Sequence, residues 1–364
     1  MIHEVAFLNF RGIRKGRLPL FPLTVLLGAN NSGKTTVLEA LYLLRSEDIM
    51  AASTYVKIID GKEKPLSVVE VLHEYHALLE SSGYKFLVRN YDGEARVACK
   101  TDEEFIGCVF KCGEPGVRVF RVQAKTDTYP DVSTFLRKGI DEEIEKRGRL
   151  PALGGVLLKD VGVIVGFEST PARCLFVKPQ TINLAANFLK SLWYLLRKRS
   201  LPTKVAREIS ELVSEGYITL ALEPHIGGGS TLLAILEDGS AVRLSDLGDG
   251  MRVLAMTMLL WELLKADLLL WDDIEAFMNP STLLYVADWV ASLVKGGAQA
   301  VVATHSLEAA KLLLREAEEA GIKARAILLG LWDGELRHRV LTLDELERLK
   351  AAGVDVRMAG GFLL

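Results

Sequence analysis

Apolar residues fall in short runs along the chain, and their spacing predicts strands alternating with helices. The runs at 2–10 and Leu18–Leu27 read as strands, and 34–44 reads as a helix with Leu38, Leu41 and Tyr42 on one face. Basic residues precede the run Leu18–Leu27, which therefore resembles a signal peptide. Because this run leads directly into a glycine-rich loop, we interpret it as a buried strand that enters the loop at 23–27.

The middle of the chain differs from its end. From about residue 56 to 123 the pattern is strand-rich, with short runs at 86–89, 96–99 and 117–122 between turn residues. Further elements are expected as a charged helix at 131–147, strands at 161–167 and 174–177, and helices at 181–197 and 204–216. After Leu244 the expected elements are a helical segment at 244–265, a strand at 267–272, a helix at 280–294, a strand at 298–304, a helix at 306–320 and a strand at 324–329. The pattern predicts an α/β fold with a mainly parallel core sheet, an antiparallel β subdomain and a helical lobe.

These shifts of pattern suggest three lobes. We expect an N-terminal lobe over 1–180, a helical lobe with connecting strands over 181–243, and a C-terminal lobe over 244–364.

Composition narrows the class of protein. Among 364 residues, 49% are hydrophobic and 25% charged, as in soluble globular proteins, and no apolar window reaches the roughly 20 residues of a membrane span. We therefore expect a cytoplasmic protein without membrane insertion. The net charge of −3 leaves nucleic-acid contact to local patches such as 197–199 and 146–149, which also fit solvated helix ends. The abundance of Leu, Glu and Arg, with few Gln, is typical of a thermophile.

The four cysteines favour buried or reduced thiols over a metal site. Cys108 and Cys112 are close in sequence, but neither a second close pair nor a flanking histidine completes a zinc pattern. A disulfide is the alternative in a hyperthermophile.

The strongest motif is the loop Gly28–Thr35, a full match to G-x-x-x-x-G-K-[ST] between a strand and a helix. Its glycines and amides can wrap phosphate, Lys34 can reach the β- and γ-phosphates, and Thr35 can ligate Mg²⁺. We therefore predict ATP as ligand and Mg²⁺ as cofactor. The residues expected to contact the nucleotide here are Gly28, Asn30, Asn31, Ser32, Gly33, Lys34, Thr35 and Thr36.

Two later strands end in polar residues that suit the same chemistry. The apolar run 268–271 ends in Asp272 and Asp273, which we assign to the metal and to positioning the attacking water. The run 301–303 ends near His305, whose imidazole we expect at the γ-phosphate. Solvated strand ends and a structural histidine are the alternatives.

A second glycine-containing loop, Leu244–Arg252, precedes an apolar helix. Ser245, Gly248 and Gly250 can form another anion site from amides and a hydroxyl, although a plain helix cap has the same composition. Because one nucleotide seldom needs two phosphate loops from one chain, this loop is predicted to complete a neighbouring subunit's site.

In this order the motifs resemble those of ABC-type ATPases of the SMC, RecF and OLD group. Residues 9–13 with the loop resemble the group's opening, 244–252 its signature and 272–275 its Walker B motif. The resemblance implies a homodimer that sandwiches two ATP molecules, with Arg11 near the nucleotide. It also suggests Gln180 as the Q-loop residue, with Gln123 as a rival.

The chain departs from that group in two ways. Asp273 stands where Glu is usual, which could slow hydrolysis or shift its role partly to Glu275. Neither a Toprim nuclease domain nor a long coiled coil is expected in these 364 residues.

Three functions remain open at this stage. The first is an ATPase whose dimerisation drives or gates a DNA repair, nucleic-acid processing or defence process, with double-stranded DNA as a partner. The second is a slow regulatory switch that holds or releases a separate nuclease or effector protein. The third, a transporter subunit, is disfavoured by the form of residues 244–252.

Overall fold

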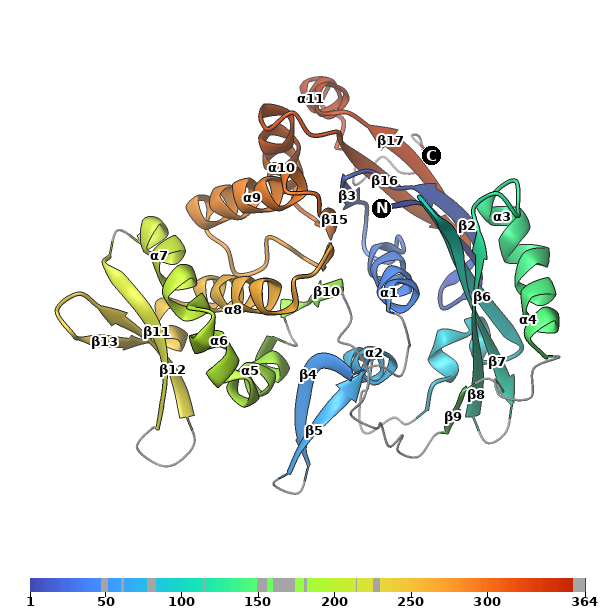
Figure 1. Cartoon of the computed structure of the whole chain (residues 1–364). Helices are drawn as coiled ribbons and strands as arrows, with labels where there is room; N and C mark the ends of the chain where they lie inside the picture. Colours follow the sequence, from blue (N-terminus) through green and yellow to red (C-terminus); the bar gives the residue numbers. More distant parts are fainter. Residues whose placement is uncertain are drawn as a thin grey trace.

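In the computed structural model, strands from both ends of the chain join in one curved sheet (Figure 1). The structure describes residues 1–46, 52–59, 62–76, 83–113, 116–148, 156–159, 174–179, 182–213, 215–224, 230–355 and 364. Its largest described sheet has 12 strands in the order β10-β14-β15-β3-β16-β17-β2-β1-β6-β7-β8-β9.

The first five strands of that order are parallel to one another, and their apolar residues are almost entirely buried. They are β10 (Cys174–Val177), β14 (Leu268–Trp271), β15 (Gln299–Ala303), β3 (Leu23–Leu27) and β16 (Ala324–Trp332). Continuous apolar runs of this kind belong to parallel sheets covered on both faces. The predicted α/β class with a parallel core is confirmed.

The remaining strands form the predicted antiparallel part, in which only β17 and β2 pair in parallel, and the antiparallel pairing of β17 with β16 joins this part to the core. These strands are β17 (Glu335–Leu341), β2 (Ile13–Pro19), β1 (Ile2–Phe10), β6 (Glu94–Thr101), β7 (Glu104–Gly113), β8 (Gly116–Lys125) and β9 (Val156–Lys159). The basic residues of the signal-like stretch thus lie in β2. The predicted strand Leu18–Leu27 is wrong in its first half, because the chain turns at 20–22 before β3 begins.

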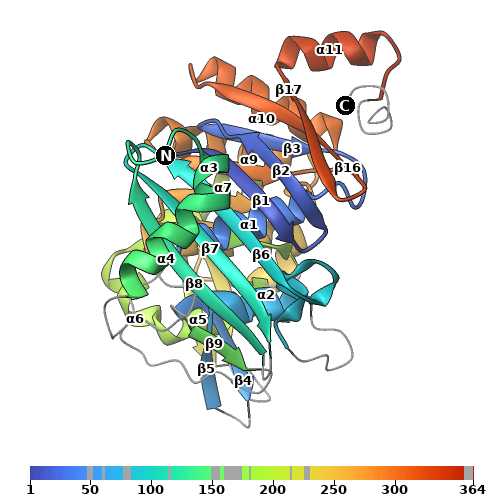
Figure 2. The same cartoon turned by 90° about the vertical axis from the view of Figure 1, so that its right-hand side faces the viewer.

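Helices cover both faces of the sheet. Helix α1 (Lys34–Arg45) lies on the concave side, between the parallel core and β6–β7 (Figure 1). The outer face of β1, β6, β7 and β8 is covered by α3 (Val132–Thr134), a π-helical segment (Phe135–Gly139) and α4 (Ile140–Gly148), as Figure 2 shows. Near the core lie α8 (Asp249–Leu264), α9 (Pro280–Lys295), α10 (Leu307–Glu319) and α11 (Leu343–Ala351).

A separate group of elements contains α5 (Ile182–Ser191), α6 (Trp193–Lys198) and α7 (Leu201–Val213) beside a three-stranded antiparallel sheet. That sheet comprises β11 (Tyr217–Pro224), β12 (Ser230–Leu236) and β13 (Ala241–Arg243). A hairpin of β4 (Ala52–Ile59) and β5 (Lys62–Ser67) leads into α2 (Val68–His76).

One predicted strand in the strand-rich region is wrong. Residues 86–89 fall in two short 3₁₀ turns, because Asn90 and Tyr91 adopt left-handed φ values of 58° and 62° that end any extended run. Only Val88 keeps a β-bridge, to Phe10. Helix α2 was not predicted at all. The predicted strand at 161–167 lies outside the described residues.

The cysteines do not gather around one ion. Cys108 and Cys112 lie four residues apart on β7, roughly 14 Å along an extended strand. Burial raises the pKa of the Cys99 thiol to about 12 and that of Cys108 to about 11. All four cysteines are free thiols. Of the helices that the structure describes, none has both the length and the apolar character that crossing a bilayer requires.

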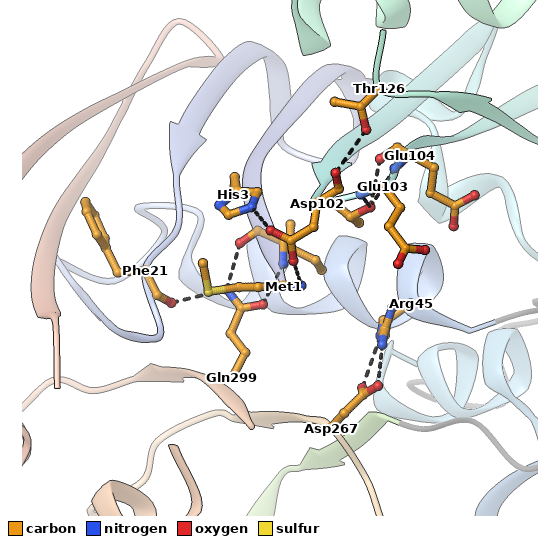
Figure 3. A network of polar contacts seen from close by, with 12 residues as sticks. Met1, His3, Phe21, Arg45, Asp102, Glu103, Glu104, Thr126, Asp267 and Gln299 are labelled. Carbon is orange, nitrogen blue, oxygen red and sulfur yellow. Dashed lines mark hydrogen bonds and ion pairs between the residues drawn. The ribbon is translucent and has the colours of Figure 1, made fainter. Parts of the chain in front are cut away.

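Polar contacts tie the amino ends of the core strands together (Figure 3). The Gln299 side chain accepts from the Ile2 amide at 2.8 Å and donates to the carbonyls of Ile2 at 2.7 Å and Phe21 at 3.1 Å. Arg45, at the end of α1, pairs with Asp267 just before β14. Because these residues lie at strand beginnings, the network fixes the sheet edge opposite the carboxyl ends of the core strands.

Candidate nucleotide site

The loop Gly28–Thr35 lies at the carboxyl end of β3, and its backbone has the shape of a phosphate cradle. Gly28 and Gly33 have φ values of 148° and 95°, which side-chain-bearing residues rarely adopt. A Cβ on Gly28 would lie 2.5 Å from the carbonyl oxygen of Leu329, so only glycine fits there. The hydroxyl of Ser32 is buried without a hydrogen-bond partner among the described residues. The loop therefore has an unused donor and a helix N-terminus facing one cleft.

Strand register brings the acidic motif to the same edge. The Asp272 amide donates to the Val177 carbonyl, and the Thr304 amide donates to the Leu26 carbonyl, so both residues extend the ladders of their strands. The Thr35 hydroxyl donates to Asp272 Oδ2 at 2.9 Å. Asp272 is only 2% exposed. Two residues 237 positions apart in sequence thus lie in contact at one edge of the sheet.

Thr35 and Asp272 fit the needs of Mg²⁺. A hydroxyl and a carboxylate are the protein oxygens that hold this ion beside nucleotide phosphates in P-loop enzymes. When bound there, the ion would neutralise charge on the phosphate oxygens. Among the described residues no group of three or more His, Cys, Asp and Glu side chains forms a cage of its own.

Lys34 lies over the loop. Its ammonium donates to the carbonyls of Gly28 at 2.9 Å and Ala29 at 3.0 Å. Burial lowers the pKa of Lys34, and the nearby carboxylates of Asp272 and Asp273 offset part of this effect. The ammonium is thus held in the cleft by weak neutral acceptors that phosphate oxygens can replace.

Asp273 and His305 face each other across the cleft, with 3.6 Å between Asp273 Oδ1 and His305 Nε2. Burial, and then repulsion from Asp272, raises the pKa of Asp273. Its φ of 52° turns the chain sharply after β14.

Glu275 has a different environment. Its carboxylate accepts from the Thr304 hydroxyl at 2.6 Å and from the His305 amide at 2.8 Å. Glu275 therefore anchors the backbone that carries His305, and only Asp273 and His305 of the three predicted catalytic residues line the cleft.

The cleft has a volume of about 380 Å³ and a wall that the motifs did not predict. Arg11 lines it, as the resemblance implied, and beside Arg11 lie His76 from α2 and Lys178 after β10. Lys178 Nζ lies 3.8 Å from Asp272 Oδ2. No sequence motif marks His76 or Lys178, since each enters the site only through the packing of its element. The described lining is Arg11, Gly12, Ile13, Asn30, Asn31, Ser32, Gly33, Lys34, Thr35, Thr36, His76, Lys178, Asp273, His305 and Leu331.

The Q-loop assignment has no support from the described residues. Gln180 lies outside them. Gln123 lies on β8, where its amide donates to Glu104 on the neighbouring strand at 3.4 Å, and it does not line the cleft.

The second glycine loop lies elsewhere on the chain. Residues 244–247 form a 3₁₀ turn, Gly248 has a φ of 93°, and α8 begins at Asp249. Ser245 is exposed and lines a separate cleft of about 180 Å³ with Arg252 and Lys190. Gly250 packs on the turn after β14, where an added Cβ would lie 2.4 Å from the Phe277 carbonyl oxygen. Among the described residues that line the nucleotide cleft, none belongs to 244–252.

Two family profiles match the chain on either side of its middle. The family described as "AAA ATPase domain" matches residues 1–119, and the one described as "AAA domain, putative AbiEii toxin, Type IV TA system" matches residues 177–310. An uncharacterised protein of Methanocaldococcus jannaschii is 32% identical over 116 residues, which cover 99% of that relative and 30% of this chain.

Solved structures share the fold. An Smc head bound to the C-terminal winged-helix domain of ScpA has a TM-score of 0.51 at 15% identity, with 95% of this chain and 99% of that chain covered. A Pyrococcus furiosus Smc head with an extended coiled coil, bound to the C-terminal domain of ScpA, has a TM-score of 0.50 at 13% identity, with 97% and 99% covered. At such identities the likeness concerns the fold alone.

Fold and site together define an ABC-type P-loop ATPase. The two family profiles that match its parts describe AAA ATPase domains, and its fold is the one that Smc heads share.

Proposed function

We propose that the protein binds ATP with Mg²⁺ and hydrolyses the γ-phosphate in a head-to-tail homodimer. The observation that supports this most strongly is the 2.9 Å bond between Thr35 and Asp272, which sets the two metal-binding oxygens beside the phosphate loop. In the proposed reaction Asp273 orients the attacking water, and the water's oxygen forms a bond to the γ-phosphorus as the bond to the β-phosphate oxygen breaks, so that ADP leaves and the water's proton passes to the phosphate product.

Each remaining group has a role in this scheme. Lys34 exchanges its hydrogen bonds to the loop carbonyls for contacts with the β- and γ-phosphates. His305, which faces Asp273, donates a hydrogen bond to the γ-phosphate. Glu275 keeps the His305 backbone in place. The loop with Ser245, Gly248 and Gly250 closes the site of the second subunit, because Ser245 and Gly248 are exposed and do not line the chain's own cleft.

For the biological role, we propose that ATP-driven pairing drives or gates a nucleic-acid or defence process. Arg197, Lys198 and Arg199 are exposed at the end of α6 and remain candidates for a DNA contact. In the other basic patch, 146–149, Lys146 forms an ion pair with Glu143 at 2.7 Å. This pairing weakens its attraction for a DNA phosphate.

A slow regulatory switch is the second candidate. Asp273 is one methylene shorter than glutamate and lies on a left-handed turn, so its reach toward a water at the γ-phosphate is restricted. Both Smc heads named above are bound to a ScpA domain. By analogy, a separate effector protein could dock on this chain.

Steady-state ATP turnover at raised temperature, with and without double-stranded DNA, tests these roles. The proposal predicts Mg²⁺-dependent turnover that Lys34→Ala abolishes, and DNA stimulation would favour the nucleic-acid role. Slow turnover indifferent to DNA would favour the switch. Turnover unchanged by Lys34→Ala would overturn the proposed site.

A further inference from the structure

Glu39 is a fully buried carboxylate on α1, one turn beyond the phosphate loop. It has no exposed surface, whereas an unpaired carboxylate in such a place would cost several kcal/mol. Two side chains compensate it: Arg11 forms an ion pair with Oε2, and His76 Nε2 lies 2.7 Å from Oε1. These partners come from the turn after β1 and from the end of α2, so the carboxylate joins three elements.

The hydrogen-bond partners of His76 determine which of its ring nitrogens carries the proton. The Arg11 guanidinium can only donate, so the 3.3 Å contact between Arg11 Nη2 and His76 Nδ1 makes that nitrogen an acceptor. The proton of the imidazole is therefore on Nε2, where it is donated to Glu39. Burial, together with the positive charges of Arg11 and Lys178, lowers the pKa of His76 to about 3. His76 is thus a neutral bridge between Glu39 and Arg11.

Arg11 is held from other directions as well. Its backbone has a left-handed φ of 52°, and its amide donates to the Leu87 carbonyl at 3.1 Å. The Phe86 ring lies 5.9 Å from the guanidinium carbon and 5.4 Å from the His76 ring. The side chain keeps 17% of its surface exposed, and it lines the nucleotide cleft.

We propose that Glu39 is a positioning residue for nucleotide binding, holding Arg11 and His76 in the cleft wall so that Arg11 donates to the nucleotide phosphates. A guanidinium has five N–H donors, and Glu39 and His76 occupy part of them. The others remain for phosphate oxygens. The proposal rests on the proposed ATP function and adds that the affinity for ATP is set partly by a group that never touches it.

A double-mutant cycle tests this inference, with the Kd of a fluorescent ATP analogue as readout and KM and kcat measured beside it. Glu39→Gln keeps the size and one hydrogen bond but removes the charge that orients Arg11. We expect it to raise Kd and KM by about tenfold with little change in kcat, since the contact exists before and during the reaction. In an Arg11→Met background the same change should have no further effect, because its target is gone.

Several controls make the outcome unambiguous. Glu70→Gln changes another buried glutamate, which bonds to the Ser67 amide at the start of α2, and it should leave Kd unchanged. Should Glu39→Gln fail to fold, His76→Gln can still donate to Glu39 but offers Arg11 no ring nitrogen, and it should raise Kd by a few-fold. Kd unchanged in the folded variant, or equal effects of Glu39→Gln with and without Arg11, would overturn the positioning role. Intact binding in Lys34→Ala would instead overturn the proposed function itself.

Discussion

Two glycine loops lead into helices in this molecule, and their surroundings differ. The loop at 28–35 is enclosed by its own chain: Leu329 packs against Gly28, Lys34 is 5% exposed, and Asp272 bonds to Thr35. The loop at 244–252 is open: a Cβ added to Gly248 would meet no described atom within 4 Å, and Ser245 is exposed. Both have a serine hydroxyl and lead into a helix, but only the first contacts the strand-end carboxylate of Asp272. In the proposed dimer, the second loop completes a site only together with another molecule.

The largest expected effect comes from removing the charge of the enclosed loop. Lys34→Ala should lower ATP turnover by at least about 100-fold, the size of loss typical when one donor to a transition state is removed. It should also weaken ATP binding. Phosphate release measured under saturating ATP checks this result, and turnover near that of the unchanged protein would contradict it.

The next largest effect on turnover is expected from a change to Asp272, the carboxylate proposed to bind Mg²⁺. Asp272→Asn keeps an acceptor for the Thr35 hydroxyl but removes the charge that attracts Mg²⁺, so turnover should fall by tens of fold and the Mg²⁺ requirement should rise. A titration of turnover against Mg²⁺ measures both. Asp333→Asn, an exposed surface change, serves as the control and should shift neither.

The parts of the site that could be predicted from the sequence are those formed by one continuous segment of the chain. The enclosed loop and the strand ending at Asp272 were predicted because each is a continuous motif with a strand on one side. The wall formed by His76 and Lys178 was not predicted. Helix α2 lies within a stretch whose pattern is strand-rich, and its last residue reaches the cleft only because the helix packs near α1. The parallel pairing of β17 with β2 was also invisible, because it joins residues about 320 positions apart and no local pattern specifies it.

The open loop can be blocked without touching the enclosed one. Ser245→Arg places a bulky cation where the partner's phosphates would lie, so ATP-dependent dimerisation should be lost while the single chain still binds ATP. Light scattering with and without ATP gives the mass, and analogue binding gives the affinity. Dimerisation that persists would refute the role of this loop across subunits.

Alanine substitutions at two glycines of the loop 244–252 form a matched pair with smaller expected effects. Gly250→Ala puts a Cβ within 2.4 Å of the Phe277 carbonyl oxygen and should displace the turn after β14, lowering both turnover and melting temperature. Gly248→Ala meets open space but keeps a strained φ of 93°, and should cost about 1 kcal/mol of stability. Thermal melting of both variants ranks them, and the reverse order would contradict this packing.

A separate effect is expected in the acid dependence of stability. The pKa of His76 is lowered to about 3 in the folded chain, whereas an unfolded histidine titrates near 6.5. Both states are neutral above pH 6.5. Below it the unfolded chain takes up the proton first, so stability should fall as the pH drops from about 6.5 toward 3. His76→Gln removes this contribution, and melting temperatures across that range should decline less steeply than for the unchanged protein.

The central claim is that an enclosed loop of one chain and an open loop of another form one ATP site. Mixing Lys34→Ala protein with Ser245→Arg protein tests it most directly, since each variant alone should be inactive. In a mixed dimer both changes fall in one site and leave the other intact, so the mixture should recover roughly a quarter of normal turnover if subunits exchange freely. A mixture as inactive as its two components would contradict the claim.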